Sequence, residues 1–281
     1  MPHDDAAARH PATRRVAAHR HGPGGPPCPV GGDESGRRET VADETPVALT
    51  YNRHSFAVMM ASPTDLVDFA LGFSLSEGVI ESAEEFLAAE VVPLARGIEL
   101  AVTVTESRAL ALRARHRALA GRTGCGLCGV DSIAEALRPI PRLDTASRIA
   151  AAAIDRAVAA FPADQPLNRQ TGATHAAAFA DLDGRILATR EDVGRHNALD
   201  KLIGALAAAG IDTATGFVVV SSRCSYEMVH KTAAAGIPLI ASVSAPTGLA
   251  VDLAEKVGIG LAAFARDGRF TVYAGCERID A

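Results

Sequence analysis

The sequence predicts an α/β (α+β) fold, in which a larger C-terminal domain with a mixed sheet covered by helices accompanies a smaller N-terminal α+β domain. From about residue 146, continuous apolar strands alternate with amphipathic helices, which indicates a sheet covered on both faces. Residues 45 to about 120 instead mix strand patterns with a helix pattern. A length of 281 residues suits about two domains.

We therefore expect four segments along the chain. They are a leader at 1–41, the smaller α+β domain at 42–122, a cysteine-containing loop with its connecting helix at 123–145, and the larger α/β domain at 146–281. The leader mixes Pro, Gly, Arg and His without an apolar stretch that could offset the entropy of ordering a backbone, so we expect it to be disordered. It also lacks the apolar core of a signal peptide.

The smaller domain is predicted from apolar and β-branched runs and one amphipathic helix. Strand patterns lie at 46–52, 54–61 and 97–105. A helix should follow the second strand, because Ser62 is a good N-cap and Pro63 would stand at the first helical position, where a missing N–H costs nothing. Its apolar stripe comprises Leu66, Phe69, Ala70 and Phe73. Residues 109–120 are ambiguous between strand and helix.

The larger domain shows a regular alternation of elements. Strand patterns lie at 174–180, 185–190, 216–222 and 237–244, and helix patterns at 199–210, 225–236 and 247–258. Asp183-Gly184 is a strong turn signal that predicts a hairpin between the first two strands. A second hairpin, 261–275, has Asp267-Gly268 at its turn.

Composition excludes several classes of protein. A net charge of −5 leaves no general basic field to hold a nucleic-acid backbone. No apolar run approaches the roughly 20 residues that a membrane span needs. The five cysteines are odd in number and no secretory signal precedes them, which indicates reduced thiols in a cytoplasm.

The most chemically suggestive segment is a C-x-x-C formed by Cys125 and Cys128. Neighbouring glycines allow tight turns and leave the sulfurs accessible, and the capping-box spacing of Ser132 and Glu135 predicts a helix that starts just after the pair. A helix N-terminus lowers the pKa of a nearby thiol and so favours nucleophilic chemistry. Three other interpretations of the pair fit less well. A structural zinc site would need a second pair of ligands, and a dithiol exchanger would carry the motif within a βαβ pattern; the sequence shows neither. A zinc deaminase would need an H-x-E motif upstream, which is also absent. A nucleophilic or sulfur-carrying pair is favoured.

A second polar cluster lies at residues 190–201, before an apolar helix. Asn197 could cap that helix, and free N–H groups beside Arg195 would suit an anion, although a solvated helix start is the alternative. Ser221, Ser222 and Arg223 follow a predicted buried strand, where open α/β sheets bind ligands. We interpret Cys224 as a packing residue or an incidental thiol. A glycine fingerprint for dinucleotides is absent.

Six motifs occur in a set order along the chain: C-G-L-C-G, T-G-A-T-H, E-D-V-G-R-H-N-A-L-D-K, S-S-R-C-S-Y-E-M-V-H-K, G-I-P-L-I-A-S-V-S-A-P-T and F-A-R-D-G-R-F. In this order they resemble the FdhD family, the sulfur carrier proteins required for formate dehydrogenase activity. The likeness runs from about residue 42 to 279. The length of the leader and the cysteine at position 224 depart from the family pattern.

The resemblance implies a sulfurtransferase. Such proteins accept persulfide sulfur from a cysteine desulfurase and pass it to a molybdenum (or tungsten) bis(molybdopterin guanine dinucleotide) cofactor, which serves the formate dehydrogenase catalytic subunit. Their larger domain resembles the cytidine-deaminase fold without its zinc chemistry, and they are typically homodimers. The resemblance implies no tightly held metal, no nucleic-acid partner and no membrane association.

The resemblance also implies roles for individual residues. Cys125 is the expected persulfide carrier, and Cys128 would assist or resolve the transfer. The expected cofactor-binding residues are Phe264, Ala265, Arg266, Asp267, Gly268 and Arg269, with Arg195, His196 and Arg223 as further anion contacts. A non-catalytic cofactor chaperone, in which the C-x-x-C is structural or binds a metal, stays open as the alternative function.

Overall fold

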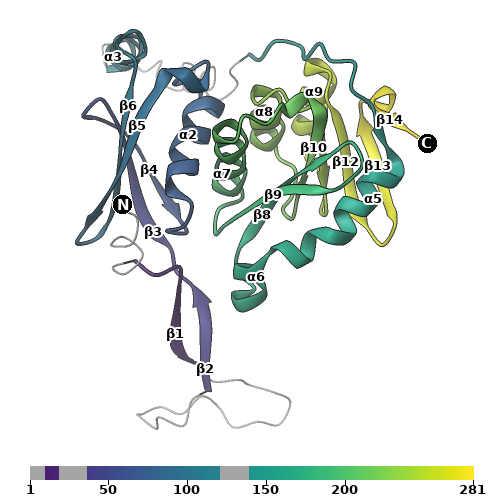
Figure 1. Ribbon diagram of the computed structural model, residues 1–281, viewed down its shortest axis with the longest axis horizontal. Helices are drawn as coiled ribbons and strands as arrows, with labels where there is room; N and C mark the ends of the chain where they lie inside the picture. Colours follow the sequence, from purple (N-terminus) through teal and green to yellow (C-terminus); the bar gives the residue numbers. More distant parts are fainter. Residues whose placement is uncertain (1–9, 19–36, 121–138) are drawn as a thin grey trace.

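The computed structural model describes residues 10–18, 37–120 and 139–281. They form a four-stranded sheet and a six-stranded sheet with helices packed between them (Figure 1). The expected mixed α/β fold is thus confirmed, while the finer expectation of a cytidine-deaminase-like larger domain and the segment boundaries stay predictions. No helix among the described ranges is long and apolar enough to cross a bilayer.

A two-stranded ribbon stands in place of part of the expected disordered leader. Strands β1 (Thr13–Ala18) and β2 (Arg37–Ala42) pair antiparallel, with Thr13 opposite Ala42, and protrude from the body (Figure 1). The Asp43 N–H donates to the Ala12 carbonyl at 2.8 Å, and Arg14 forms an ion pair with Asp43 at 3.4 Å, so the base of the ribbon is tied down. The ladder partners lie on either side of a long polar segment, which is why apolar periodicity does not predict them.

The four-stranded sheet has the order β4-β3-β6-β5. Its strands are β3 (Thr45–Tyr51), β4 (His54–Ala61), β5 (Phe86–Leu94) and β6 (Gly97–Val104). β3 and β6 are parallel and the other neighbours antiparallel. Three of these strands match the predicted runs, but β5 has no counterpart among them. It is an edge strand, where Pro93 is tolerated because an edge leaves one row of N–H groups unpaired.

Helix α2 (Leu66–Ser76) covers the inner face of this sheet. It begins later than predicted: its N-cap is Asp65, so Ser62 and Pro63 precede the helix. Ser62 instead contacts the unit built around the six-stranded sheet: its backbone N–H donates a hydrogen bond to Asp192, and its carbonyl accepts one from Lys201. Residues 109–120, which the sequence left ambiguous between strand and helix, belong to helix α3 (Glu106–Ala120). A short 3₁₀ turn, η1 (Ala83–Glu85), precedes β5.

The six-stranded sheet has the order β13-β12-β11-β10-β8-β9. Its strands are β8 (His175–Asp181), β9 (Ile186–Asp192), β10 (Gly216–Val220), β11 (Leu239–Ser242), β12 (Gly260–Arg266) and β13 (Arg269–Ala274). β10, β11 and β12 are parallel, and hairpins extend the sheet on both sides, as the Asp-Gly turns predict. The predicted mixed sheet is confirmed.

Helices cover both faces of this sheet, and alternate residues of β10 show the division. Val218 and Val220 face the core formed with α7 (Arg195–Ala208), α8 (Tyr226–Ala234) and α9 (Gly248–Val257). Phe217 and Val219 face a second core formed with α5 (Ala151–Ala160). A strand buried on both faces explains the unbroken apolar run in the sequence.

Short elements complete the larger unit. They are β7 (Ile149–Ala150), η2 (Phe161–Asp164), α6 (Pro166–Thr171), η3 (Thr213–Thr215), η4 (Cys276–Arg278) and β14 (Ile279–Asp280). β7 and β14 pair in parallel, which brings the chain's end beside the start of α5. Helix α5 and Phe161 of η2 pack on the sheet face that carries Phe217 and Val219, and residues of the run α5–η2–α6 line a pocket.

Candidate functional site

The predicted C-x-x-C lies outside the described residues, because Cys125 and Cys128 fall within 121–138. Helix α3 ends at Ala120, immediately before this segment, and the chain is described again from residue 139. The described part of the site is formed by the other predicted residues and by the elements around them.

The β12–β13 hairpin carries the predicted cofactor segment 264–269 in an unusual backbone conformation. Asp267 and Gly268 have φ values of 54° and 68°, as a tight turn requires. Phe264 also has a positive φ, 53°, next to an irregularity in the β12–β13 register between Ala263 and Arg266. A left-handed conformation is costly for an aromatic residue, and such strain concentrates at functional positions. The Phe264 N–H donates to the Ser244 carbonyl at 3.1 Å, which holds the strained residue.

A pocket of about 530 Å³ lies where this hairpin meets the ends of the central strands. One wall is the hairpin, the opposite wall is the α5–η2–α6 run, and the strand ends close the base. The lining residues are Asp155, Val158, Ala159, Phe161, Pro162, Gln165, Asn168, Ser221, Val243, Ala265, Arg266, Asp267 and Gly268. Apolar walls with a few polar groups are typical of small-molecule sites.

The structure brings four of the predicted cofactor residues together at this pocket: Ala265, Arg266, Asp267 and Gly268. Ser221, which the strand-end argument singled out, lines it too, and its hydroxyl accepts from the Ala176 N–H at 2.9 Å. Sequence reasoning missed the α5–η2–α6 wall. Its residues belong to no motif, and only the packing of α5 and Phe161 on the sheet brings them to the same pocket as the hairpin.

Arg195, His196 and Arg223 do not line this pocket. They lie near the first turns of α7 and α8, which cover the opposite face of the sheet. His196 Nε2 lies 2.9 Å from Glu227 Oε2. Burial is the main cause that lowers the pKa of His196, with the nearby charge of Arg195 adding to it and Glu227 opposing it. Burial followed by the same Arg195 charge lowers the pKa of His175.

Five polar residues of the 190–201 cluster are buried rather than solvated: Glu191, Asp192, Asn197, Asp200 and Lys201. Lys201 Nζ lies 2.7 Å from Asp192 Oδ2, and both side chains are completely buried. Asp192 also accepts from the backbone N–H of Ser62 at 2.9 Å and of Gly194 at 2.8 Å. Asn197 does not cap α7, since the N-cap is Gly194; its Nδ2 instead donates to Asp192 and to the Met60 carbonyl.

A second buried ion cluster joins the two units at Asp200, the residue of α7 that precedes Lys201. Lys231 Nζ lies 2.9 Å from Asp200 Oδ1 and 2.7 Å from Glu77 Oε1, and the Ser76 hydroxyl donates to Asp200 at 2.6 Å. Burial raises the pKa of Asp200 although Lys231 opposes this. Burial alone would lower the pKa of Lys231, but the two carboxylates outweigh it and raise that pKa. These charged residues position helices rather than face a ligand.

The two described cysteines differ sharply in environment. Cys224 is buried, and burial raises the pKa of its thiol to about 12, so it stays protonated at neutral pH. This agrees with its interpretation as a packing residue. Cys276 is exposed near the chain's end. Within the residues that the structure describes, no group of three or more His, Cys, Asp or Glu side chains is placed to hold a metal ion.

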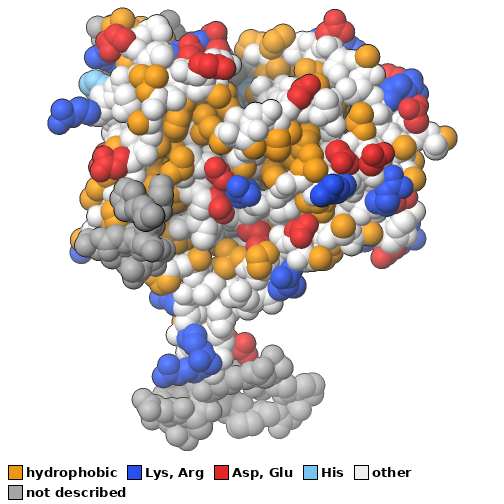
Figure 2. Space-filling model, in the orientation of Figure 1, with side chains coloured by type: hydrophobic (Ala, Val, Ile, Leu, Met, Phe, Trp, Pro, Cys, Tyr) orange, Lys and Arg blue, Asp and Glu red, His pale blue; other side chains and the backbone are white. Residues whose placement is uncertain are grey.

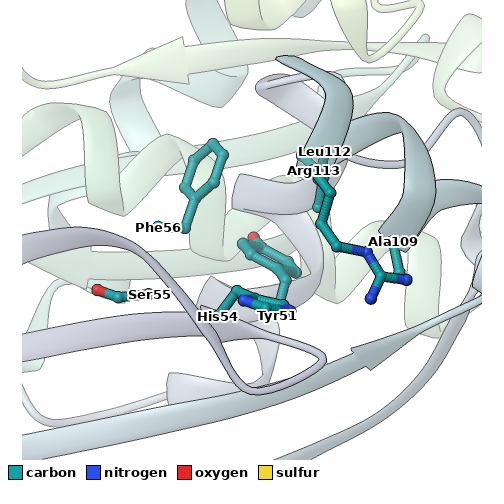
Figure 3. Close-up of a pocket in the computed structure, with 7 residues that line it drawn as sticks. All are labelled: Tyr51, His54, Ser55, Phe56, Ala109, Leu112 and Arg113. Atoms are coloured by element: carbon teal, nitrogen blue, oxygen red, sulfur yellow. The ribbon is translucent and has the colours of Figure 1, made fainter. Parts of the chain in front are cut away.

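A separate cavity of about 470 Å³ lies in the smaller unit, between the β3–β4 turn and α3 (Figure 3). It is lined by Tyr51, His54, Ser55, Phe56, Ala109, Leu112 and Arg113. The Tyr51 hydroxyl is already hydrogen-bonded to Ser74 at 2.9 Å, and Arg113 donates to Glu106 at 2.8 Å. No residue predicted to be functional lies here.

Surface charge agrees with the composition. Figure 2 shows acidic and basic side chains interspersed over the described part of this face, with no continuous basic field. Any anionic ligand must therefore be held by local groups, such as Arg266 at the hairpin pocket, rather than by the general field of the protein.

Comparison with known proteins gives a consistent result. Residues 42–280 match the FdhD/NarQ family. The sulfur carrier protein FdhD of Xanthomonas euvesicatoria pv. vesicatoria is 52% identical over 250 residues, 89% of each chain, and that of Bordetella petrii is 50% identical over 241 residues, 86% of this chain and 87% of the relative. A crystal structure from Desulfotalea psychrophila, whose description proposes a formate dehydrogenase accessory protein, is similar with a TM-score of 0.69 and 26% identity, covering 95% of this chain and 98% of the other.

Proposed function

The chain belongs to the FdhD/NarQ family, and on that basis we propose that it is a sulfur carrier required for formate dehydrogenase activity. The observation that carries the proposal is the likeness to proteins named sulfur carrier protein FdhD, at about half identity over nearly nine-tenths of both chains. The C-x-x-C of Cys125 and Cys128 lies inside the matched range.

In the proposed first step, the Cys125 thiolate attacks the terminal sulfur of a persulfide on a cysteine desulfurase. A new S–S bond forms at Cys125, the S–S bond of the donor breaks, and the donor cysteine leaves as a thiolate. Cys128 assists the transfer or resolves the product. In the sequence, Cys125 stands between Gly124 and Gly126.

In the proposed second step, the S–S bond at Cys125 breaks and the terminal sulfur bonds to the reduced metal of a molybdenum (or tungsten) bis(molybdopterin guanine dinucleotide) cofactor. The metal supplies the two electrons that convert this sulfur to sulfide and is itself oxidised, and Cys125 returns as a thiolate. The cofactor is the substrate here, not a resident group. We propose that its nucleotide part binds the pocket formed by the β12–β13 hairpin and α5–η2–α6. Arg266 lines that pocket and Arg269 ends the hairpin turn, so both can approach phosphates.

Phe264 stands at the strained end of the same segment with 40% of its surface exposed. An exposed aromatic ring held against its backbone preference is suited to contact a flat ligand. Arg195, His196 and Arg223 do not line this pocket, so we assign them to a more distant part of the same large acceptor or to a protein partner.

The proposed partners are a cysteine desulfurase and the catalytic subunit of formate dehydrogenase, with a second copy of this chain as a homodimer and a cytoplasmic setting that keeps thiols reduced. In this proposal, the donor and the acceptor protein bind the same cysteine loop one after the other.

Intact-mass spectrometry tests the proposal. The purified chain is incubated with a cysteine desulfurase, cysteine and pyridoxal phosphate, and wild type is compared with Cys125→Ala, Cys128→Ala and the control Cys276→Ala. We expect a gain of one or more sulfur atoms, about 32 Da each, that disappears in Cys125→Ala and persists in Cys276→Ala. The control matters because Cys276 is exposed.

Absence of a mass gain in wild type, with an active desulfurase, would contradict the sulfur-carrier proposal. The alternative, a non-catalytic cofactor chaperone with a structural or metal-binding C-x-x-C, predicts stoichiometric zinc by elemental analysis and a lower melting temperature for Cys125→Ala. Normal folding of Cys125→Ala without metal would count against that alternative.

A further inference from the structure

The hairpin pocket contains a carboxylate that no family motif includes. Asp155 lies on α5, half-buried in the wall opposite Arg266. No described residue forms a hydrogen bond or ion pair with the side chain of Asp155 or with that of Arg266. A carboxylate and a guanidinium that line one pocket without pairing leave both groups available for a ligand.

Besides polar Gln165, Asn168 and Ser221, the pocket has several apolar lining residues. Val158 and Phe161 come from the α5–η2 wall, Val243 from the strand ends and Ala265 from the hairpin. Phe161 is almost completely buried, so packing holds its ring in a fixed position at the pocket surface. Apolar walls of this kind suit the faces of a flat heterocycle, with the polar edges left to side chains.

From this arrangement we infer that Asp155 selects guanine as the base of the nucleotide that the pocket binds. The inference rests on the proposed function, which places a guanine dinucleotide here. The phosphates lie toward Arg266 and Arg269, and the base lies toward α5. Asp267 also lines the pocket, but its side chain is 76% exposed on the hairpin turn, whereas Asp155 is half-buried and so is the better-placed carboxylate for a base.

The chemistry of purine edges explains the selection. Guanine presents two adjacent N–H donors, N1–H and the 2-amino group, which a carboxylate accepts side by side. Hypoxanthine lacks the 2-amino donor. Adenine places an acceptor at N1, and xanthine places a carbonyl at position 2, so each sets an oxygen or nitrogen lone pair against the Asp155 carboxylate. An unpaired or repelled carboxylate in a half-buried site disfavours binding.

Titration calorimetry of the full chain with GDP, IDP, ADP and XDP tests the inference. Wild type should bind GDP about 10-fold or more tightly than IDP, with ADP and XDP weaker still. Asp155→Asn should weaken GDP and strengthen XDP, because the amide donates to the xanthine carbonyl. Asp252→Asn is the matched control, since Asp252 is an exposed aspartate on α9, which packs against the opposite face of the sheet.

The outcomes separate the inference from the proposed function. A gain of XDP binding by Asp155→Asn, with Asp252→Asn unchanged from wild type, supports the inference and also shows that the variant is folded. Unchanged GDP affinity in Asp155→Asn, or equal wild-type affinities for GDP, IDP and ADP, overturns the inference while cofactor binding stands. Wild type that binds no nucleotide overturns the inference and the pocket assignment together, whereas sulfur loading is still decided by mass spectrometry.

Discussion

Gly72 of α2 and Gly204 of α7 bring the backbones of their two helices into direct contact. A Cβ atom added to Gly72 would lie 1.7 Å from the Asp200 carbonyl oxygen, and one added to Gly204 would lie 1.9 Å from the Asp68 carbonyl oxygen. Both obstacles are backbone atoms, which cannot turn aside as a side chain can. The smaller unit therefore packs on the larger one through a close contact between the α2 and α7 backbones, which a residue larger than glycine would prevent.

We expect Gly72→Ala to lower the free energy of unfolding by about 3 kcal/mol, the upper part of the range for overpacked cores. Urea denaturation followed by circular dichroism measures this. Gly248→Ala is the matched control, because a Cβ there meets nothing within 4 Å, and replacing helical glycine should leave stability unchanged or raise it by about 0.5 kcal/mol. Equal midpoints for the two variants would show that α2 and α7 can separate without cost.

Lys201 neutralises the fully buried carboxylate of Asp192, so replacing Lys201 should lower the free energy of unfolding. We expect Lys201→Met to cost about 3 kcal/mol, because Asp192 would keep its N–H donors but lose its cation. Lys256→Met on the exposed side of α9 should change stability by no more than about 0.5 kcal/mol. Chemical denaturation compares them. If a Lys201→Met/Asp192→Asn double variant were no more stable than Lys201→Met, the stranded charge would not be the cause.

Two half-buried histidines should make stability depend on pH near neutrality. Burial lowers the pKa of His175 and His196 in the folded state below the ordinary histidine value of 6.5, so the unfolded chain binds protons first as the pH falls. Stability contributed by these groups is therefore present above about pH 6.5 and declines below it, until the folded-state pKa is passed. Urea midpoints measured between about pH 7.5 and about pH 5 follow the decline.

The variant His175→Gln/His196→Gln should flatten this part of the pH profile. His54→Gln, which changes an exposed histidine in the β3–β4 hairpin, serves as the control and should keep the wild-type slope. A double variant whose slope matches that of wild type would assign the acid sensitivity to other groups, of which the carboxylate–lysine cluster around Asp200 is the first candidate.

The strained backbone of Phe264 should lower the stability of the fold, while its ring should strengthen nucleotide binding. Replacing it with glycine removes the strain of an aromatic residue at φ 53°, so we expect the melting temperature to rise by a few degrees, equivalent to about 1 kcal/mol. Nucleotide affinity measured by calorimetry should fall in the same variant. Asp267→Gly, at φ 54° in the same hairpin, should gain less, because aspartate tolerates this conformation better. A less stable Phe264→Gly would mean that contacts of the ring, such as that with Tyr273, outweigh the strain.

Local chemistry explains what the sequence predicts well. The turns at Asp183-Gly184 and Asp267-Gly268 and the apolar runs of β10 and β11 depend on neighbours within a few residues, and the structure contains them. The ordered motifs predict the family for the same reason, since they are read directly from the chain. The predicted start of α2 is wrong because Ser62 has two competing uses, and its distant partners Asp192 and Lys201 decide between them.

The sequence by itself determined the alternation of elements and the hairpin that carries 264–269, and it contains the C-x-x-C on which the sulfur-transfer proposal rests. Only the tertiary structure decided that Asp192 and Lys201 are buried between units, and that α5–η2–α6 faces the hairpin across a pocket. Periodicity and turn preference act over a few residues, whereas burial and pocket walls arise where segments more than a hundred residues apart meet.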